Sequence, residues 1–415
     1  MFQISEITYD YLERAGQIQK GFRLAFFNLN KRPISKTNAV LERSEGVSQS
    51  LSQTSARTST PLLIGSVEAF SGKSATVLGL ALQLREKGLD IAYAKPIGTC
   101  PSETDDCVDE DVRFIGQTLG LTADQIRSPL FTLDETTIKQ QLSEERQDYL
   151  QKVESSLASG NEDILLIEGP GNLEEGSLFG LSLPNIAKAS AAAVVLVARY
   201  HSALVVDKLL AASQKLGDRL LGVVINDVPE NLIETAQNEV RDCLERHNIR
   251  VFGILPRTPI MRSVSVEALV HHLNAEILNN PERIDQMMVE EISIGAMNAN
   301  SALRYFNQAH NMVVVTGGDR FDIQMAALES STQCLVLTGR LSPRKDILDR
   351  AKDLEVPILS VDLDTLTTVE IIEKAFDQVR LHEPIKVECI GHLMAQHFDT
   401  SRLIDAMGLN PAVPA

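Results

Sequence analysis

Residues 61–88 read PLLIGSVEAFSGKSATVLGLALQLREKG, a run that contains a strand, a loop and a helix in that order. Residues 62–64 are Leu-Leu-Ile, a short apolar run typical of a buried strand. Beyond the loop, apolar residues recur from Val77 to Leu84, and Gly88 follows the last turn, where glycine commonly ends a helix. The stretch therefore predicts a β-strand that leads through a loop into an α-helix.

The helix opens at Ser71-Gly72-Lys73-Ser74. At such a position backbone N–H groups and the helix N-terminus hold phosphate, a lysine adds a point charge, and a serine hydroxyl reaches magnesium. We interpret the loop as a phosphate-binding loop of atypical length. The usual spacing GxxxxGK[ST] would place glycine at position 67, where this chain has Val67. The alternative is a helix N-terminus that merely contains Gly-Lys-Ser.

Composition limits the class of protein. A chain of 415 residues predicts two or three domains, and 44% hydrophobic with 23% charged residues is ordinary for a soluble globular protein. The net charge of −17 argues against partners such as nucleic acid or a membrane surface, which need clustered Lys and Arg. A nucleotide needs only a few local donors, so nucleotide binding remains compatible with this charge.

Cysteine usage and the N-terminus indicate a cytoplasmic protein. The five cysteines form no CxxC pair and read as reduced thiols. No apolar run is long enough to span a membrane, and the first residues contain no cleavable apolar core. We expect residues 1–60 to be a mobile extension, because residues 46–60 are a Ser/Thr/Gln tract that cannot bury enough surface.

From residue 61 onward, near-continuous apolar runs alternate with helical patterns, which predicts an α/β fold with a mostly parallel sheet covered by helices on both faces. The further runs that we predict as strands of this domain, 61–263, are 91–94, 163–167, 192–198, 220–225 and 251–255. Polar side chains follow the ends of several strands, at Lys95, Glu168, Asn226 and Arg257. Ligands of open α/β sheets bind at that edge, so we expect a binding site there.

Two carboxylates are candidates for holding magnesium. Glu168 ends a buried strand beside the phosphate-binding loop, where a carboxylate commonly helps to hold the metal, although it could instead cap the turn EGPG. Asp111 is a second candidate, and the alternative is that Asp111 or Asp109 only caps the following helix.

Three further groups have two interpretations each. Lys95 could neutralise charge on a triphosphate or an anionic substrate, or it could be a surface lysine that covers an apolar strand. Asn226 could read an adenine edge or serve as a turn residue in NDVP. Residues 317–319, Gly-Gly-Asp, could form an anion-binding loop, but we favour a tight turn with Asp319 as the helix N-cap.

A second, smaller α/β unit is predicted for residues 264–380, followed by a C-terminal tail, 381–415, with helix-like pieces. The runs that we predict as its strands are 291–297, 312–316, 334–337 and 358–361.

The ordered motifs resemble a known pair of domains. GSVEAFSGKSA, AYAKPIGT, DILLIEGPGN, GVVINDV and FGILPRTPIMR are similar to the dethiobiotin-synthetase-like P-loop ATPase domain found at the N-terminus of long phosphotransacetylases. GAMNANSALRYF, VVVTGGDRFDIQMAAL, LVLTGRLSP and ILSVDLDTLTT resemble the DRTGG domain that follows it in those proteins. The resemblance covers about residues 60–380.

The resemblance implies the cofactors ATP and Mg²⁺ and a set of roles. It implies phosphate contacts from residues 71–74, magnesium at Ser74, Asp111 and Glu168, and Lys95 beside the γ-phosphate or substrate. Lys73 and Lys95 are thus the candidate catalytic residues. The full set of predicted nucleotide-binding residues is Glu68, Ser71, Gly72, Lys73, Ser74, Ala75, Asn226 and Arg257.

From these features we expect an ATP-binding sensor or regulator with slow ATPase activity, an unidentified small-molecule ligand and a homo-oligomeric state. The first alternative is an enzyme that activates a carboxylate or carbamate with ATP, as dethiobiotin synthetase does, and the second is a degenerate scaffold. We do not expect acetyl transfer, since that domain would need about 300 further residues. EGPGN and the acidic loop 101–110 also argue against biotin synthesis.

Overall fold

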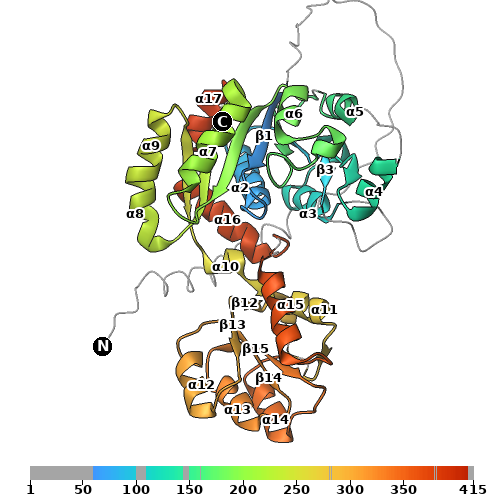
Figure 1. Cartoon of the computed structure of the whole chain (residues 1–415), viewed down its shortest axis with the longest axis vertical. Helices are drawn as coiled ribbons and strands as arrows, with labels where there is room; N and C mark the ends of the chain where they lie inside the picture. The colour runs from blue at the N-terminus through green and yellow to red at the C-terminus, as the bar shows by residue number, and fades with distance from the viewer. Residues whose placement is uncertain are drawn as a thin grey trace, which may run out of the picture. The chain divides into compact units, whose positions relative to one another are not determined.

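The computed structural model describes residues 59–99, 109–143, 149–158, 160–279, 281, 283–377, 379 and 381–409 (Figure 1). Residues 1–58 of the extension that we predict at residues 1–60 lie outside the described residues, as does most of the acidic loop 101–110, whereas Thr60 begins the first strand. Cys100 and Cys107 also lie outside them, whereas Cys243, Cys334 and Cys389 are free thiols.

The first sheet has seven strands, all parallel, in the order β4-β2-β6-β1-β7-β8-β9. Its strands are β1 (Thr60–Ser66), β2 (Ile91–Ala94), β4 (Ile126–Arg127), β6 (Ile164–Glu168), β7 (Ala193–Arg199), β8 (Leu220–Val228) and β9 (Val251–Pro256). A separate parallel pair is formed by β3 (Ile97–Gly98) and β5 (Phe131–Thr132). The predicted mostly parallel sheet is confirmed, and it places the ends of β1, β6 and β7 side by side.

Helices cover both faces of this sheet. Leu63 and Ile167 belong to one apolar core and their neighbours Leu62 and Ile64 belong to another, because successive side chains of a strand point to opposite faces. The helices of this region are α2 (Lys73–Glu86), α3 (Glu110–Leu119), α4 (Glu135–Ser143), α5 (Tyr149–Ser156), α6 (Leu183–Ala189), α7 (Val205–Leu216), α8 (Ile233–Thr235), α9 (Arg241–Arg246) and α10 (Pro259–Arg262). A π-helical turn, Ala236–Val240, joins α8 to α9.

The two C-terminal helices, α16 (Pro384–His397) and α17 (Thr400–Met407), join the core that contains α2. Figure 1 shows α16, near the end of the chain, beside α2, near its beginning. Ile390 and Met394 of α16 approach α2 so closely that a Cβ added at Gly79 would lie 2.9 and 2.5 Å from them. The segment that we predicted as a tail therefore supplies part of the first sheet's cover.

The second sheet has five strands in the order β11-β16-β15-β14-β13. They are β11 (Glu276–Ile277), β13 (Glu291–Ile294), β14 (Met312–Gly317), β15 (Thr332–Thr338) and β16 (Ile358–Ser360). Only β11 pairs antiparallel among the described strands of this sheet. A short antiparallel pair, β10 (Val264–Ser265) and β12 (Met288–Val289), lies outside it.

Helices also cover both faces of the second sheet. Val314 belongs to one apolar core and its neighbour Val313 to another. The helices are α11 (Val266–Leu273), α12 (Ala299–Phe306), α13 (Phe321–Leu328), α14 (Lys345–Asp353) and α15 (Thr365–Asp377). Our preference for Asp319 as the cap of α13 was wrong, because Arg320 occupies the N-cap position and no side chain caps the helix.

Among the helices that the structure describes, none is both long enough and apolar enough to cross a bilayer.

Candidate functional site

The loop between β1 and α2 has a backbone shape that requires glycine at its last position. Gly72 precedes the helix with φ +88°, in the left-handed region that favours glycine. A Cβ at Gly72 would also lie 2.1 Å from Nδ2 of Asn226, and that nitrogen donates a 2.9 Å hydrogen bond to the carbonyl oxygen of Ser71. The side chain of Asn226, near the end of β8, therefore holds the loop in place by a hydrogen bond to the loop's backbone.

The N-terminus of α2 carries the features of an anion-binding site. No side chain caps the helix, and its first turn contains no acidic residue. The hydroxyl of Ser71 is buried and makes no hydrogen bond within the part of the chain that the structure describes. Uncapped N–H groups, the positive end of the helix dipole and an unsatisfied buried hydroxyl together fit a phosphate group.

Glu168 faces this helix start from the end of β6. Its Oε1 accepts a 2.7 Å hydrogen bond from the hydroxyl of Ser74 and lies 3.7 Å from Nζ of Lys73. Its Oε2 accepts a 2.8 Å hydrogen bond from the hydroxyl of Tyr93 on β2. Only 2% of the Glu168 side chain is exposed, so its negative charge acts in a poorly hydrated environment. Burial, and then the Glu168 carboxylate, raise the pKa of the Tyr93 hydroxyl.

Lys95 lies at the end of β2 and contacts two carboxylates. Its Nζ is 3.0 Å from Oδ1 of Asp109 and 2.6 Å from Oδ2 of Asp111. Burial alone would lower the pKa of the Lys95 ammonium, but Glu168, Asp111 and Asp109 outweigh burial and raise it. Lys95 is therefore a buried, charged lysine and not one that covers a strand at the surface.

The structure separates the two roles that we left open for Asp109 and Asp111. Asp109 is the N-cap of α3, and its Oδ1 accepts hydrogen bonds from the backbone N–H groups of Asp111 and Val112. Asp111 lies in the first turn and directs its Oδ2 toward Lys95. Burial would raise the pKa of the Asp111 carboxyl, but a hydrogen bond from His382 and the charge of Lys95 lower it.

The remaining predicted residues lie in the first turn of α2, in the loop and directly after β9. Ala75 is buried in the first turn of α2, and Glu68 in the loop pairs with Lys208 of α7 at 2.8 Å. Arg257, after β9, pairs with Asp227 at 2.9 Å, and Asp227 also pairs with Arg199 of β7 at 2.8 Å. Arg257 is thus held at the strand edge by a neighbour of Asn226.

Three contacts of the site were not predicted. Tyr93 touches Glu168, Asp109 touches Lys95, and His382, from the segment before α16, lies 3.1 Å from Asp111. A tyrosine hydroxyl within the apolar strand IAYA was a signal for the first contact. Nothing in the sequence indicated that residue 382 returns to residue 111.

A metal at this site would depend on the nucleotide. Within the described ranges, no group of three or more His, Cys, Asp or Glu side chains is arranged to hold a metal ion. Magnesium usually keeps several waters and binds through one or two carboxylates and substrate phosphates, so the sparse donor set of Ser74 and Glu168 fits magnesium.

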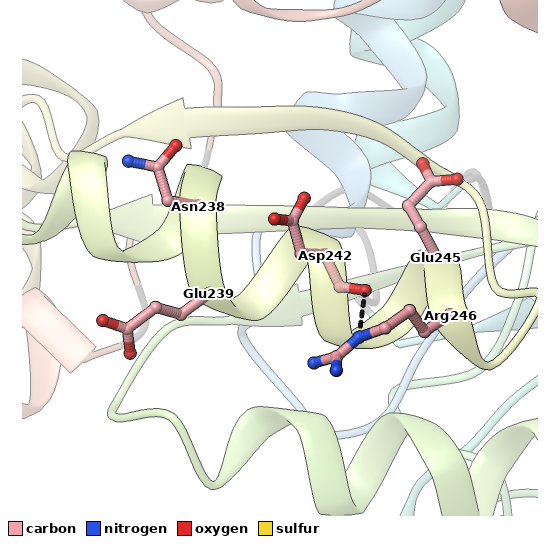
Figure 2. Close-up of a pocket in the computed structure, with 5 residues that line it drawn as sticks. All are labelled: Asn238, Glu239, Asp242, Glu245 and Arg246. Carbon is pink, nitrogen blue, oxygen red and sulfur yellow. Dashed lines mark hydrogen bonds between the residues drawn. The ribbon is translucent and has the colours of Figure 1, made fainter.

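A surface hollow lies away from these residues, along the π-helical turn and α9 (Figure 2). It is lined by Asn238, Glu239, Asp242, Glu245 and Arg246. Arg246 donates a hydrogen bond to the backbone oxygen of Asp242, and Glu245 pairs with Arg402 of α17 at 2.7 Å. Glu245 thus ties α9 to α17, and the contact of Arg246 stays within α9.

Two family models match consecutive parts of this chain. An AAA domain model matches residues 60–265, and a DRTGG domain model matches residues 268–375. The phosphate acetyltransferase of Nitratidesulfovibrio vulgaris is 25% identical over 365 residues, which cover 82% of this chain and 51% of that protein. The phosphate acetyltransferase of Synechocystis sp. is 24% identical over 367 residues, covering 83% of this chain and 51% of that protein.

The chain spans about half the length of these curated relatives. Among solved structures, one is of the CBS and DRTGG domains of the regulatory region of Clostridium perfringens pyrophosphatase, complexed with its activator diadenosine tetraphosphate. It is 18% identical, covers 41% of this chain and 85% of that chain, and has a TM-score of 0.26. The resemblance inferred from the motifs is confirmed: the chain joins a P-loop AAA domain to a DRTGG domain, the pair that matches the N-terminal part of long phosphotransacetylases.

Proposed function

We propose that the protein binds ATP together with Mg²⁺ and acts as a regulator or sensor that hydrolyses ATP slowly. One observation carries the proposal: the Ser74 hydroxyl lies 2.7 Å from the Glu168 carboxylate at the uncapped start of α2. A hydroxyl and a carboxylate beside a phosphate-binding helix start are the protein donors that a nucleotide-bound magnesium needs.

The phosphates would lie on the backbone N–H groups of residues 71–75, with the Ser71 hydroxyl as an added donor. Lys73 is the cation for the β- and γ-phosphates. Its ammonium is 3.7 Å from Glu168, too long for a hydrogen bond, so the lysine can turn to a phosphate without breaking a strong contact. Magnesium held by Ser74 and Glu168, with Asp111 as the further carboxylate, would neutralise the charge of the phosphates.

Lys95 would lie beside the γ-phosphate and supply a positive charge there. Its charge is balanced by Asp109 and Asp111, so a bound phosphate must compete with two carboxylates for it. This arrangement supports a site for nucleotide with its metal more than a site for a small anionic substrate. Asn226 would hold the loop and lie near the base, and Arg257 and Glu68 would line the rim.

The regulatory part of the proposal is supported by the domain that follows. A DRTGG domain lies in the regulatory region of the Clostridium perfringens pyrophosphatase, and this chain carries a DRTGG domain at residues 268–375. We propose that the nucleotide state changes how the AAA domain, the DRTGG domain or the subunits of a homo-oligomer pack, in response to a small ligand.

Isothermal titration calorimetry of the full chain with ATP and Mg²⁺ tests the proposal. The wild type should bind, and Lys73→Ala should weaken binding on the order of tenfold or more, because hydrogen bonds to charged groups contribute about 1.5–3 kcal/mol. Lys87→Ala removes an exposed lysine just after the same helix and should bind as the wild type does.

Equal heats for the wild type and Lys73→Ala would contradict the proposal. Phosphate release that depends on an added small carboxylic acid or amine would indicate an activating enzyme instead. A melting temperature that no nucleotide shifts would indicate a scaffold that binds none, since a ligand of the folded state raises stability by mass action.

A further inference from the structure

His382 connects the C-terminal part of the chain to the candidate site. It lies after the DRTGG match, which ends at residue 375, and before α16, which begins at Pro384. Its Nε2 is 3.1 Å from Oδ1 of Asp111, a residue 271 positions earlier in the chain. Its ring also lies against the ring of Phe114, with centroids 5.0 Å apart, so α3 holds the imidazole through two contacts.

The contact acts on a carboxylate that has a partner on each of its two oxygens. Oδ1 of Asp111 faces His382, and Oδ2 accepts a 2.6 Å hydrogen bond from Lys95. A carboxylate with a donor on each oxygen has its orientation set, whereas one with a single donor can rotate about that contact. His382 and Lys95 therefore fix the orientation of the Asp111 carboxylate together.

The segment that follows His382 also contacts α2, the helix of the phosphate-binding loop. Directly after His382, α16 packs along the helix that begins with Lys73, and Ile390 and Met394 approach Gly79. Such close packing leaves little room for α16 to shift without moving α2. One short segment thus touches both the first turn of α3 and the helix of the phosphate-binding loop.

We propose that His382 is a positioning residue of the nucleotide site, which holds Asp111 toward Lys95 and the metal, and that it thereby couples nucleotide occupancy to residues 381–397, the segment that contains α16. The inference rests on the proposed function and assigns a positioning group to its site. His382 acts through Asp111 and does not itself contact the nucleotide.

Calorimetry of the full chain with ATP, once in Mg²⁺ and once in EDTA, tests the positioning role. His382→Ala should raise the Kd for ATP in Mg²⁺ by about tenfold, the lower end of losses for groups that orient metal ligands, and leave the Kd in EDTA unchanged. His382→Gln keeps a side-chain N–H donor and should restore most of the affinity. His392→Ala is the control, because His392 lies on α16 with 57% of its side chain exposed.

Two variant results would overturn the positioning role. One is equal affinity of His382→Ala and the wild type in Mg²⁺. The other is an equal loss in Mg²⁺ and in EDTA, which would mean that His382 only supports the fold. If the wild type itself binds no ATP, the proposed function fails and this inference fails with it, and that result is distinct from the other two.

Hydrogen exchange of the wild type tests the coupling without any variant. The amides of residues 381–397 should exchange more slowly with ATP and Mg²⁺ than with ATP in EDTA, because a fixed Asp111 holds His382 and the start of α16. Unchanged exchange in this segment, measured where calorimetry shows saturation, would overturn the coupling.

Discussion

The hydroxyl of Ser74 donates a 2.7 Å hydrogen bond to Oε1 of Glu168, although the two residues are 94 positions apart in the chain. The contact exists because β1 and β6 are parallel neighbours, with Ile64 opposite Glu168, so the helix that follows β1 starts beside the end of β6. The Ser74 hydroxyl, which here donates to the buried Glu168 carboxylate, is therefore also positioned to bind a cation together with that carboxylate.

Glu168→Gln should separate metal-dependent from metal-independent binding of ATP. The substitution keeps the side-chain shape but removes the charge that Mg²⁺ prefers, so affinity for ATP in Mg²⁺ should fall by at least about tenfold. In EDTA the variant should bind ATP as well as the wild type or better, since a negative charge beside the phosphates is gone. Glu174→Gln, in an exposed glutamate that pairs with Lys215, is the control. An equal change in both buffers would contradict the metal role.

Gly72→Ala should damage the phosphate-binding loop more than a similar change elsewhere. Both Gly72 and Gly120 have positive φ, at +88° and +58°, so alanine strains the backbone at either position. At Gly72 the new Cβ would also clash with Asn226, whereas Gly120 faces open space. We expect Gly72→Ala to abolish measurable ATP binding in calorimetry and Gly120→Ala to bind as the wild type does. Wild-type affinity in Gly72→Ala would show that the loop shape is not needed.

The charge on Asp111 should make the fold sensitive to acid. Burial would raise the pKa of this carboxyl, but the hydrogen bond from His382 and the charge of Lys95 lower it below its ordinary value of 3.8. A pKa that is lower in the folded state than in the unfolded state adds stability above pH 3.8, and this contribution is lost as pH falls through the folded-state pKa.

Urea unfolding at a series of pH values measures this effect. Between about pH 5 and pH 2 the unfolding free energy of the wild type should fall more steeply than that of Asp111→Asn, which has no proton to bind there. Asp405→Asn, an exposed aspartate of α17, should follow the wild type. Parallel curves for Asp111→Asn and the wild type would contradict the prediction.

The packing of α16 on α2 predicts opposite effects for two glycine substitutions. A Cβ at Gly79 would lie 2.5 Å from Met394, whereas a Cβ at Gly391 would lie 3.6 Å from Leu82, an ordinary contact. Gly79→Ala should therefore destabilise the protein by about 1–3 kcal/mol through overpacking. Gly391→Ala should be neutral or stabilising by up to about 1 kcal/mol, because alanine favours a helix interior. Thermal and urea unfolding distinguish the two, and equal effects would contradict the close packing.

The first strand, the loop and the first helix were predictable because their information is local. An apolar run, a glycine-containing loop and a helical repeat follow one another, and the structure has β1 at Thr60–Ser66 and α2 at Lys73–Glu86. The position of the binding site, at the carboxyl ends of the strands, was also predictable, since polar residues follow the ends of several parallel strands. Glu168 beside Ser74 follows directly from that rule.

Contacts between distant segments were not predictable from the sequence. The return of α16 to α2 left only one trace, Gly79 inside a helical pattern, where an isolated glycine marks a close approach. His382 beside Asp111 left no trace, because no periodicity connects residues so far apart. Asp109 and Asp111 look alike as caps in the sequence, and only the structure shows that Asp109 caps α3, that Asp111 lies in its first turn and that both pair with Lys95.

A crystal structure of the full chain with Mg²⁺ and a non-hydrolysable ATP analogue tests the central claim most directly. We predict the phosphates on the backbone of residues 71–75, with Mg²⁺ about 2.0–2.1 Å from Oγ of Ser74 and Glu168 beside it, directly or through water. An analogue bound elsewhere, or a direct hydrogen bond between Ser74 and Glu168 that persists without a metal at saturating analogue, would contradict the account.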